Sequence, residues 1–284
     1  MKRNTRSKNH TAVKKNTPNY NYPPSIEGRT IKKQYGQHFL RTQSVVDHMI
    51  NKVTINPSSS IMEIGCGDGF LSRSILQTNA ARLWIFEIDH DWATYVQQHY
   101  PDKRMRVIED NILSTNLEPL REFAPWILLA NLPYQITFPI LHRIREYKDL
   151  FTEGVVMVQE EVAQKIVSKG GRGYGFISLF LQYHFDWQLM EKIKPGAFLP
   201  PPSVDSRLLY FKPRQSQPIP KAEEFWNFIK MCFRQPRRTF RNNMMQSHYA
   251  IDKISEDLLE LRAQQMSFEQ LLSIWRLIMP ESKD

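Results

Sequence analysis

The chain has 284 residues, enough for one medium-sized catalytic domain plus a small appendage, and 41% of them are hydrophobic, as in an ordinary globular protein. No run approaches the roughly 20 apolar residues that a membrane span needs. The N-terminus, MKRNTRSKNH, lacks the apolar core of a secretory signal. Two cysteines, Cys66 and Cys232, exclude a disulfide framework and a four-ligand zinc site. We therefore expect a cytoplasmic protein that needs neither a metal nor a membrane.

The net charge of +9 is concentrated in two segments. Residues 1–33 hold nine lysines and arginines and one acid, Glu27, so nine minus one, or +8, of the charge lies there. Residues 230–241, KMCFRQPRRTFR, add five bases and no acid. Two basic segments on a nearly neutral remainder indicate a polyanionic partner such as nucleic acid, although a basic leader can also simply aid solubility.

In chain order, residues 1–30 are polar and basic and show no apolar periodicity, so we expect a disordered tail. From Ile31 onward, short apolar runs alternate with amphipathic stretches. The predicted strands cover residues 61–65, 82–88, 105–109, 126–131 and 154–159, and the predicted helices include 70–77, 91–99 and 138–144. This alternation predicts an α/β fold, a doubly wound and mostly parallel Rossmann-like sheet, over residues 31–213.

After Pro195 the pattern changes. The proline-rich turn at 200–203 leads into a last predicted strand, 207–212, and PRQSQPIP (213–220) is typical of a linker. Beyond it, residues 222–279 show only helical periodicity, in EFWNFIKMCF, ISEDLLELRA and FEQLLSIWRLI. We therefore expect a small all-α C-terminal domain over residues 214–284.

A glycine-rich loop, EIGCGDG (63–69), follows a predicted strand and opens a helix. Such glycines allow a tight turn and close backbone approach to a ligand, although a purely structural turn would look the same. Glu87 ends the next strand, where a Rossmann-type site places an acid on ribose hydroxyls, and Asp110 with Asn111 ends the strand after that. Each acid could instead cap a helix. However, acids at the carboxyl ends of successive parallel strands point into one crevice. Asp68 inside the loop disfavours pyrophosphate, which favours S-adenosylmethionine over a nicotinamide dinucleotide.

The fourth predicted strand ends in the tetrapeptide Asn131-Leu132-Pro133-Tyr134. An adenine amino nitrogen is a poor nucleophile because its lone pair is delocalised into the ring. The Asn131 side-chain oxygen and the Leu132 carbonyl can accept its two hydrogens, and Tyr134 can stack on the base and fix the angle of attack. No strong general base is needed, since the methylated ammonium product is itself acidic. The alternative interpretation is a proline-stiffened turn beside a core tyrosine.

With this tetrapeptide and the glycine-rich loop, the chain resembles the N6-adenine methyltransferases. More specifically, it is similar to the bacterial small-subunit branch of the ribosomal RNA adenine dimethyltransferase family. The matching segments run in order from about residue 31 to the C-terminus: YGQHFL (35–40), EIGCGDG (63–69), FEID (86–89), EDNIL (109–113), NLPY (131–134), YGFIS (174–178), FLPPPSVDS (198–206) and FRQPRRTFRNN (233–243).

This resemblance implies a class I methyltransferase sheet, S-adenosylmethionine as the cofactor, and roles for individual residues. His38 and Leu40 would cover the methionine end of the cofactor, and Gly65 and Gly67 would contact its backbone. Glu87 would bind the ribose, Ile88 would pack on the adenine ring, and Asp110 would take the adenine amino group. Asn131 would lie where cofactor and target base meet, and Phe198 would stack on the target adenine near Tyr134, unless it is a core aromatic. The chain departs from the common pattern at three positions: His38, Gln135 and Pro236.

The basic segment of the C-terminal part holds four arginines at spacings of three and four residues, which predicts one face of a helix: Arg234, Arg237, Arg238 and Arg241. Phosphate contacts from these side chains would give salt-dependent affinity for RNA. The alternative is a solvated helix face.

The leading hypothesis is a monomeric enzyme that dimethylates two adjacent adenosines near the 3′ end of small-subunit (16S) rRNA during small-subunit maturation. A related enzyme acting on large-subunit rRNA is the first alternative, and the segments at 198–206 and 237–243 argue against it. A non-catalytic RNA-binding or assembly factor is the second. The presence of Glu87, Asp110 and Asn131 argues against that role.

Overall fold

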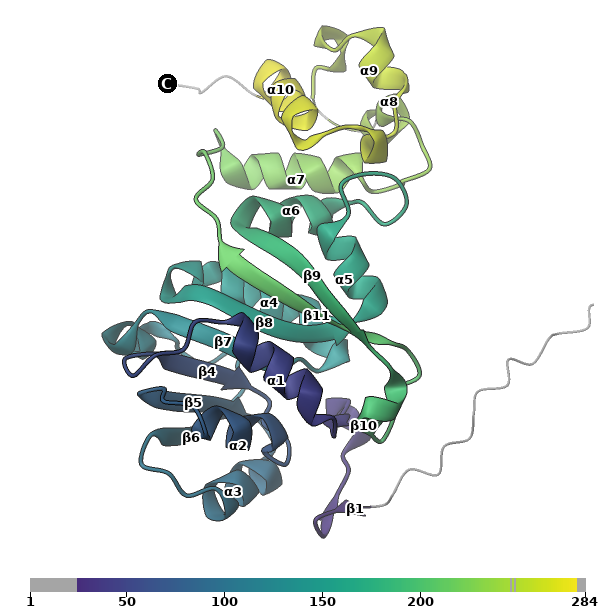
Figure 1. The fold of residues 1–284 in the computed structure, drawn as a ribbon. Coiled ribbons are helices and arrows are strands. Elements are labelled where there is room, and N and C mark those ends of the chain that lie inside the picture. The colour runs from purple at the N-terminus through teal and green to yellow at the C-terminus, as the bar shows by residue number, and fades with distance from the viewer. Residues whose placement is uncertain (1–24, 246, 248, 280–284) are drawn as a thin grey trace, which may run out of the picture.

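The computed structural model describes residues 25–245, 247 and 249–279, and these residues fold around a seven-stranded sheet (Figure 1). The strand order is β6-β5-β4-β7-β8-β11-β9. β4 to β8 run parallel, whereas β11 runs antiparallel to both of its neighbours. The strands are β4 (Ser60–Ile64), β5 (Arg82–Glu87), β6 (Met105–Glu109), β7 (Trp126–Asn131), β8 (Phe151–Gln159), β9 (Phe185–Ile193) and β11 (Ser206–Pro213).

Helices cover both faces of this sheet. One face packs on α1 (Gln43–Lys52), α2 (Phe70–Leu76) and α3 (His90–His99). The other packs on α4 (Thr137–Glu146), α5 (Glu160–Val167) and α6 (Phe176–His184). In β7, Ile127 and Leu129 face the first layer while Leu128 and Ala130 face the second. Because both faces are buried, the strand is a continuous apolar run rather than an alternating one.

This arrangement confirms the predicted fold class, and each predicted strand has a counterpart in the sheet. The sequence interpretation missed β9, which follows α6 without any intervening turn residue and mixes charged with apolar side chains. It also left α1, α5 and α6 unassigned. The antiparallel insertion of β11 between β8 and β9 lies beyond what local periodicity can specify, because strand order depends on contacts between distant segments.

The C-terminal helices pack beyond α5 and α6, at one end of the molecule (Figure 1). They are α7 (Ala222–Cys232), α8 (Phe240–Met244), α9 (Glu256–Glu260) and α10 (Phe268–Ile278). Trp226 of α7 contacts the ring of Phe180 on α6, with centroids 5.0 Å apart, and both belong to one continuous buried cluster. The all-helical character of this part matches the expectation, while its standing as a separate domain from residue 214 remains a prediction.

The predicted disordered tail falls mostly outside the described residues. Its last part, 25–30, instead forms a hairpin of β1 (Ser25–Ile26) and β2 (Arg29–Thr30). The hairpin lies against α3, where the Arg29 guanidinium sits 4.5 Å from the centroid of the Tyr95 ring. A cation on an aromatic face is a favourable contact that composition alone does not reveal. Within the described part of the chain, no helix is long and apolar enough to cross a membrane.

Candidate active site

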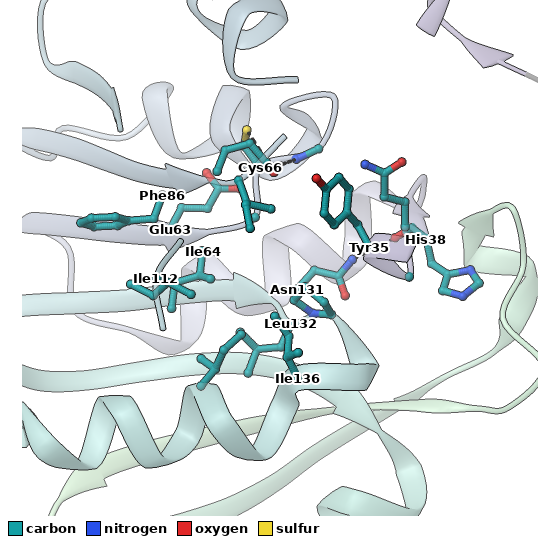
Figure 2. A pocket seen from close by; sticks show the side chains of 18 of the residues that line it. Tyr35, His38, Glu63, Ile64, Cys66, Phe86, Ile112, Asn131, Leu132 and Ile136 are labelled. Atoms are coloured by element: carbon teal, nitrogen blue, oxygen red, sulfur yellow. Dashed lines mark hydrogen bonds between the residues drawn. The ribbon is translucent and has the colours of Figure 1, made fainter. Parts of the chain in front are cut away.

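A cavity of about 270 Å³ opens at the carboxyl ends of β4, β5, β6 and β7 (Figure 2). This is the edge of a doubly wound sheet at which ligands bind. The cavity brings together eleven of the residues singled out from the sequence: His38, Leu40, Gly65, Gly67, Glu87, Ile88, Asp110, Asn131, Leu132, Pro133 and Tyr134. The spatial grouping supports a shared site, and the particular role of each residue remains a prediction.

The glycine-rich loop turns sharply from β4 into α2. Gly65 and Gly67 have φ values of +73° and +51°, a region that side chains rarely adopt. A Cβ at Gly65 would meet no atom within 4 Å, so the backbone there borders open space. At Gly67 a Cβ would lie 2.9 Å from the Phe39 ring. The loop therefore presents bare backbone to the cavity on one side and is packed tightly on the other.

Glu87 at the end of β5 is fixed by backbone donors. Its carboxylate accepts hydrogen bonds from the Gly67 amide at 3.2 Å and the Asp89 amide at 2.9 Å. Burial raises the pKa of Glu87, and these two amide bonds oppose that rise. The next residue, Ile88, leaves 47% of its surface exposed, and it lines the cavity. A buried acid followed by an exposed apolar residue suits a ribose with an adjoining purine.

Asp110 lies at the end of β6 on the same edge. It is exposed, and hydrogen bonds from the Thr115 side chain and the Asn111 amide lower its pKa. Asp68, which also lines the cavity, forms an ion pair with Arg41 at 2.7 Å. Arg41 offsets part of the Asp68 charge, so repulsion of a pyrophosphate by Asp68 is weaker than the sequence alone indicates. The prediction of S-adenosylmethionine therefore depends on the glycine-rich loop and on Glu87 and Asp110.

Residues 34–40, here called the strap, cross the cavity between the hairpin and α1, and all seven line it. The strap is anchored on the turn after β5. Lys32, just before it, forms ion pairs with Asp89 at 2.6 Å and Asp91 at 2.8 Å. Gln37 donates to the same Asp89 carboxylate at 2.9 Å. The sequence interpretation missed this anchor, although Asp89 closes the FEID segment and is almost fully buried.

Several further lining residues were missed. Figure 2 shows the Tyr35 ring directed into the space between Cys66 and Asn131. Glu63 of β4 is 1% exposed, accepts a hydrogen bond from Ser72 Oγ at 2.7 Å, and has its pKa raised to about 8 by burial. Both lie within segments matched to the family, so their position in a motif was the signal that could have found them.

The tetrapeptide follows β7 and faces the strap. The Asn131 side-chain amide donates to the His38 carbonyl at 3.0 Å, so its oxygen remains free to accept; this assignment of the amide follows from the hydrogen bond. The Leu132 amide donates to the Met157 carbonyl at 3.1 Å, which continues the sheet pairing for one more residue. No described residue donates to the Leu132 carbonyl. Both residues line the cavity, and the use of their two acceptors on an adenine amino group remains a prediction.

Tyr134 is held by two neighbours. Its hydroxyl bonds to Ser206 Oγ, and its ring stacks on His38 with centroids 5.7 Å apart. Burial raises the pKa of Tyr134, which keeps the hydroxyl neutral. Phe198, in contrast, does not line the cavity. It is 4% exposed and pairs with Leu40 across a two-stranded ribbon of β3 (Phe39–Leu40) and β10 (Phe198–Leu199). Its expected stacking on a base would require it to leave this packing, and that role remains a prediction.

The basic segment does not form the single helix that arginine spacing predicted. Helix α7 ends at Cys232 and α8 begins at Phe240, so the first three arginines lie on the exposed connecting loop. Pro236 explains the difference, because proline lacks the amide hydrogen that a helix interior needs. Arg241 does lie in α8, but it pairs with Glu256 and Glu260. Two carboxylates therefore offset part of the Arg241 charge, and its contact with RNA phosphate remains a prediction.

The parallel sheet with its antiparallel β11, together with a glycine loop and strand-end acids around one cavity, defines a class I methyltransferase. A family model described as "Ribosomal RNA adenine dimethylase" matches residues 28–279. The chain belongs to this family.

Curated relatives agree with that placement. The chain is 30% identical over 251 residues to "Ribosomal RNA small subunit methyltransferase A" of Chlorobium phaeobacteroides, covering 88% of this chain and 92% of the relative. It is 33% identical over 258 residues to the protein of the same name from Syntrophotalea carbinolica, covering 88% and 97%. The likeness therefore extends over nearly the whole of each relative.

Solved structures share the fold. A dimethyladenosine transferase from Plasmodium falciparum superimposes with a TM-score of 0.72 at 22% identity, covering 84% of this chain and 98% of that one. The 23S rRNA methyltransferase ErmE superimposes with a TM-score of 0.67 at 19% identity, covering 85% and 100%. At these identities the likeness is one of architecture.

Proposed function

We propose that this chain uses S-adenosylmethionine to dimethylate the N6 amino groups of two adjacent adenosines near the 3′ end of small-subunit rRNA, during maturation of the small subunit. The observation that carries the proposal is that Asn131, whose side-chain oxygen is free to accept, lines one cavity together with Leu132 and Tyr134. Full-length similarity to proteins named small-subunit methyltransferase A supports the choice of RNA.

The cavity suits the cofactor. The open space beside Gly65 gives the methionine part room along bare backbone, and Asp110, whose pKa is lowered, adds negative charge for a ligand that carries positive charge. Glu87 can accept from ribose hydroxyls, the exposed face of Ile88 can pack on the adenine, and Asp110 can accept from its amino group. When bound, the cofactor supplies a methyl group activated by a sulfonium.

The chain's own residues then prepare the nucleophile. The two acceptors of the tetrapeptide hold both hydrogens of the adenine amino group and draw its lone pair out of conjugation with the ring. The Tyr134 ring supports the flipped base by stacking, which contributes roughly 1–3 kcal/mol per base. After methylation the acidic N-methylated ammonium releases its proton to solvent, so no side chain has to act as a strong base. The second methylation at the same nitrogen needs the base held through one amino hydrogen and the stack.

RNA docking would use the exposed loop between α7 and α8. Arg234, Arg237 and Arg238 are exposed there, and none makes an ion pair with a residue in the described ranges. A second exposed basic loop, with Lys169 and Arg172, adjoins it between α5 and α6.

One contact joins these loops directly, because the rings of Tyr174 and Phe233 meet at 5.7 Å between centroids. The Gly171 amide also donates to the Gln264 carbonyl at 3.0 Å, which ties the α5–α6 loop to the segment between α9 and α10. We therefore include both loops in the surface that contacts RNA phosphates. Both loops belong to one chain, so we propose that the protein acts as a monomer.

The test is methyl transfer to immature small-subunit particles, compared with large-subunit RNA, with mass analysis of dimethyladenosine. We expect transfer to the small-subunit substrate only. Asn131→Ala should lower the rate by about a hundredfold or more while RNA affinity remains, because the base loses its orienting acceptor. Asn51→Ala, on the exposed side of α1, is the matched control and should keep full activity. Near-full activity of Asn131→Ala would remove this residue from the mechanism.

A further inference from the structure

His38 joins three segments that are far apart in the sequence. Its backbone carbonyl accepts the Asn131 side-chain amide at 3.0 Å, and its ring Nδ1 lies 2.8 Å from the Pro200 carbonyl. The same ring stacks on Tyr134, with centroids 5.7 Å apart and planes inclined by 28°. The strap, the tetrapeptide and the segment that leads into β11 therefore meet at this one side chain.

The hydrogen bond to Pro200 fixes the ring. A carbonyl oxygen can only accept, so Nδ1 must carry the hydrogen and donate it. The imidazole cannot turn without breaking this bond. Figure 2 shows the His38 ring at the outer edge of the cavity, on the side away from Glu63 and Phe86. The ring therefore lies beside Tyr134 and Pro200 rather than in the depth of the cavity, where a cofactor would lie.

Tyr134 is tied to the same segment a second time, through its hydroxyl and the fully buried Ser206. One end of the tyrosine is thereby held at β11, and one face of its ring is covered by the imidazole. Tyr134 is partly exposed and lines the cavity, so its ring borders the space that a target base would enter. The tilt of that ring relative to the Asn131 oxygen depends on the position of His38, since His38 contacts both residues.

We propose that His38 is a positioning residue, which sets the angle between the Tyr134 ring and the Asn131 acceptor by locking both to the 198–206 segment. This inference rests on the proposed function, because it assigns His38 to the target-base side of the reaction. It differs from the expected role at the methionine end of the cofactor. It predicts that loss of the ring lowers turnover and leaves cofactor affinity nearly intact.

Three substitutions separate the two properties of the side chain. His38→Asn keeps a donor for Pro200 and removes the ring, His38→Phe keeps a ring and removes the donor, and His38→Ala removes both. The backbone carbonyl that holds Asn131 is present in all three. His48→Ala is the matched control, since His48 is an exposed imidazole on α1 that pairs with Glu191.

The measurements are kcat and KM for RNA at saturating S-adenosylmethionine, cofactor affinity by calorimetry, and thermal stability, all on the full chain. We expect His38→Ala to lower kcat by about tenfold or more, as a misplaced reacting group does, with cofactor affinity changed less than about twofold. His38→Asn and His38→Phe should each recover part of kcat, and His48→Ala should match the parent.

A His38→Ala protein with weakened cofactor binding and unchanged kcat would overturn the inference and return the residue to the cofactor. Equal losses in all three variants, in step with thermal stability, would overturn it in favour of a structural role. If the parent methylates no small-subunit RNA, the proposed function fails. The positioning role of His38 can then still be tested by crystal structures of the parent and of His38→Ala. The Tyr134 ring should tilt away from its place against Ser206 in His38→Ala, and an unmoved ring would refute the positioning role.

Discussion

Substituting Gly67 by alanine tests whether the glycine-rich loop requires the absence of a side chain. Alanine in a left-handed conformation costs roughly 1–2 kcal/mol. The new Cβ would also lie 2.9 Å from two atoms of the Phe39 ring, which is 5% exposed and packs on Trp92 at 4.9 Å between centroids. Overpacking of this kind costs roughly 1–3 kcal/mol. We expect the free energy of unfolding to fall by roughly 2–5 kcal/mol.

Gly65→Ala provides the internal comparison. Its φ of +73° imposes similar backbone strain, but its Cβ would meet no atom within 4 Å. Urea unfolding of the ligand-free proteins should therefore show a loss of only roughly 1–2 kcal/mol for Gly65→Ala. Its methyl group would enter the cavity, so calorimetry should show a larger loss of S-adenosylmethionine affinity than of stability. Equal destabilisation by the two substitutions would refute the contact between Gly67 and Phe39 as the cause.

Three further predictions concern charge. Burial raises the pKa of Glu63 to about 8, so the folded chain retains a proton that the unfolded chain releases near pH 4.3. Stability should fall as pH rises from about 5 to 8, and Glu63→Gln should remove that part of the fall; parallel urea-unfolding profiles for parent and variant would contradict this. Lys32→Ala leaves the buried Asp89 without its cation and should weaken S-adenosylmethionine binding about tenfold in calorimetry, whereas unchanged affinity would mean that the strap holds without it. Replacing Arg237 and Arg238 by alanine should weaken RNA binding and lower its salt slope by roughly 1.5–2, and an unchanged slope would place both side chains in solvent.

The parts of the fold that the sequence predicted are those in which one local property decides the outcome. The central strands are short apolar runs because helices bury both of their faces. The glycine-rich loop predicts a turn that needs positive φ, and its glycines have positive φ. The acids Glu87 and Asp110 each follow such a run. Because parallel strands end at a common edge, their meeting in one cavity followed from the strand assignment.

The parts that escaped prediction depend on pairings between distant segments. The Tyr134 hydroxyl meets Ser206, 72 residues away, and Gln37 meets Asp89, 52 residues away. No periodicity encodes such distances. Strand β9 escaped for a related reason: it lies at the edge of the sheet, paired only with β11, and its polar side chains face water. An edge strand needs less apolar surface than a central one, so its signal in the sequence is weaker.

The arginine segment shows how tertiary contacts can alter what a charge pattern means. Spacings of three and four residues describe one side of a helix only where the backbone is helical, and Pro236 prevents that. The loop is instead fixed by Asn243, whose side chain accepts from the Gln235 amide and donates to the Gln235 carbonyl, both at 3.1 Å. This pairing satisfies backbone groups that a helix would otherwise have satisfied. The arginines consequently lie next to the loop that carries Lys169 and Arg172, so the predicted contact with RNA phosphates involves two loops rather than one helical face.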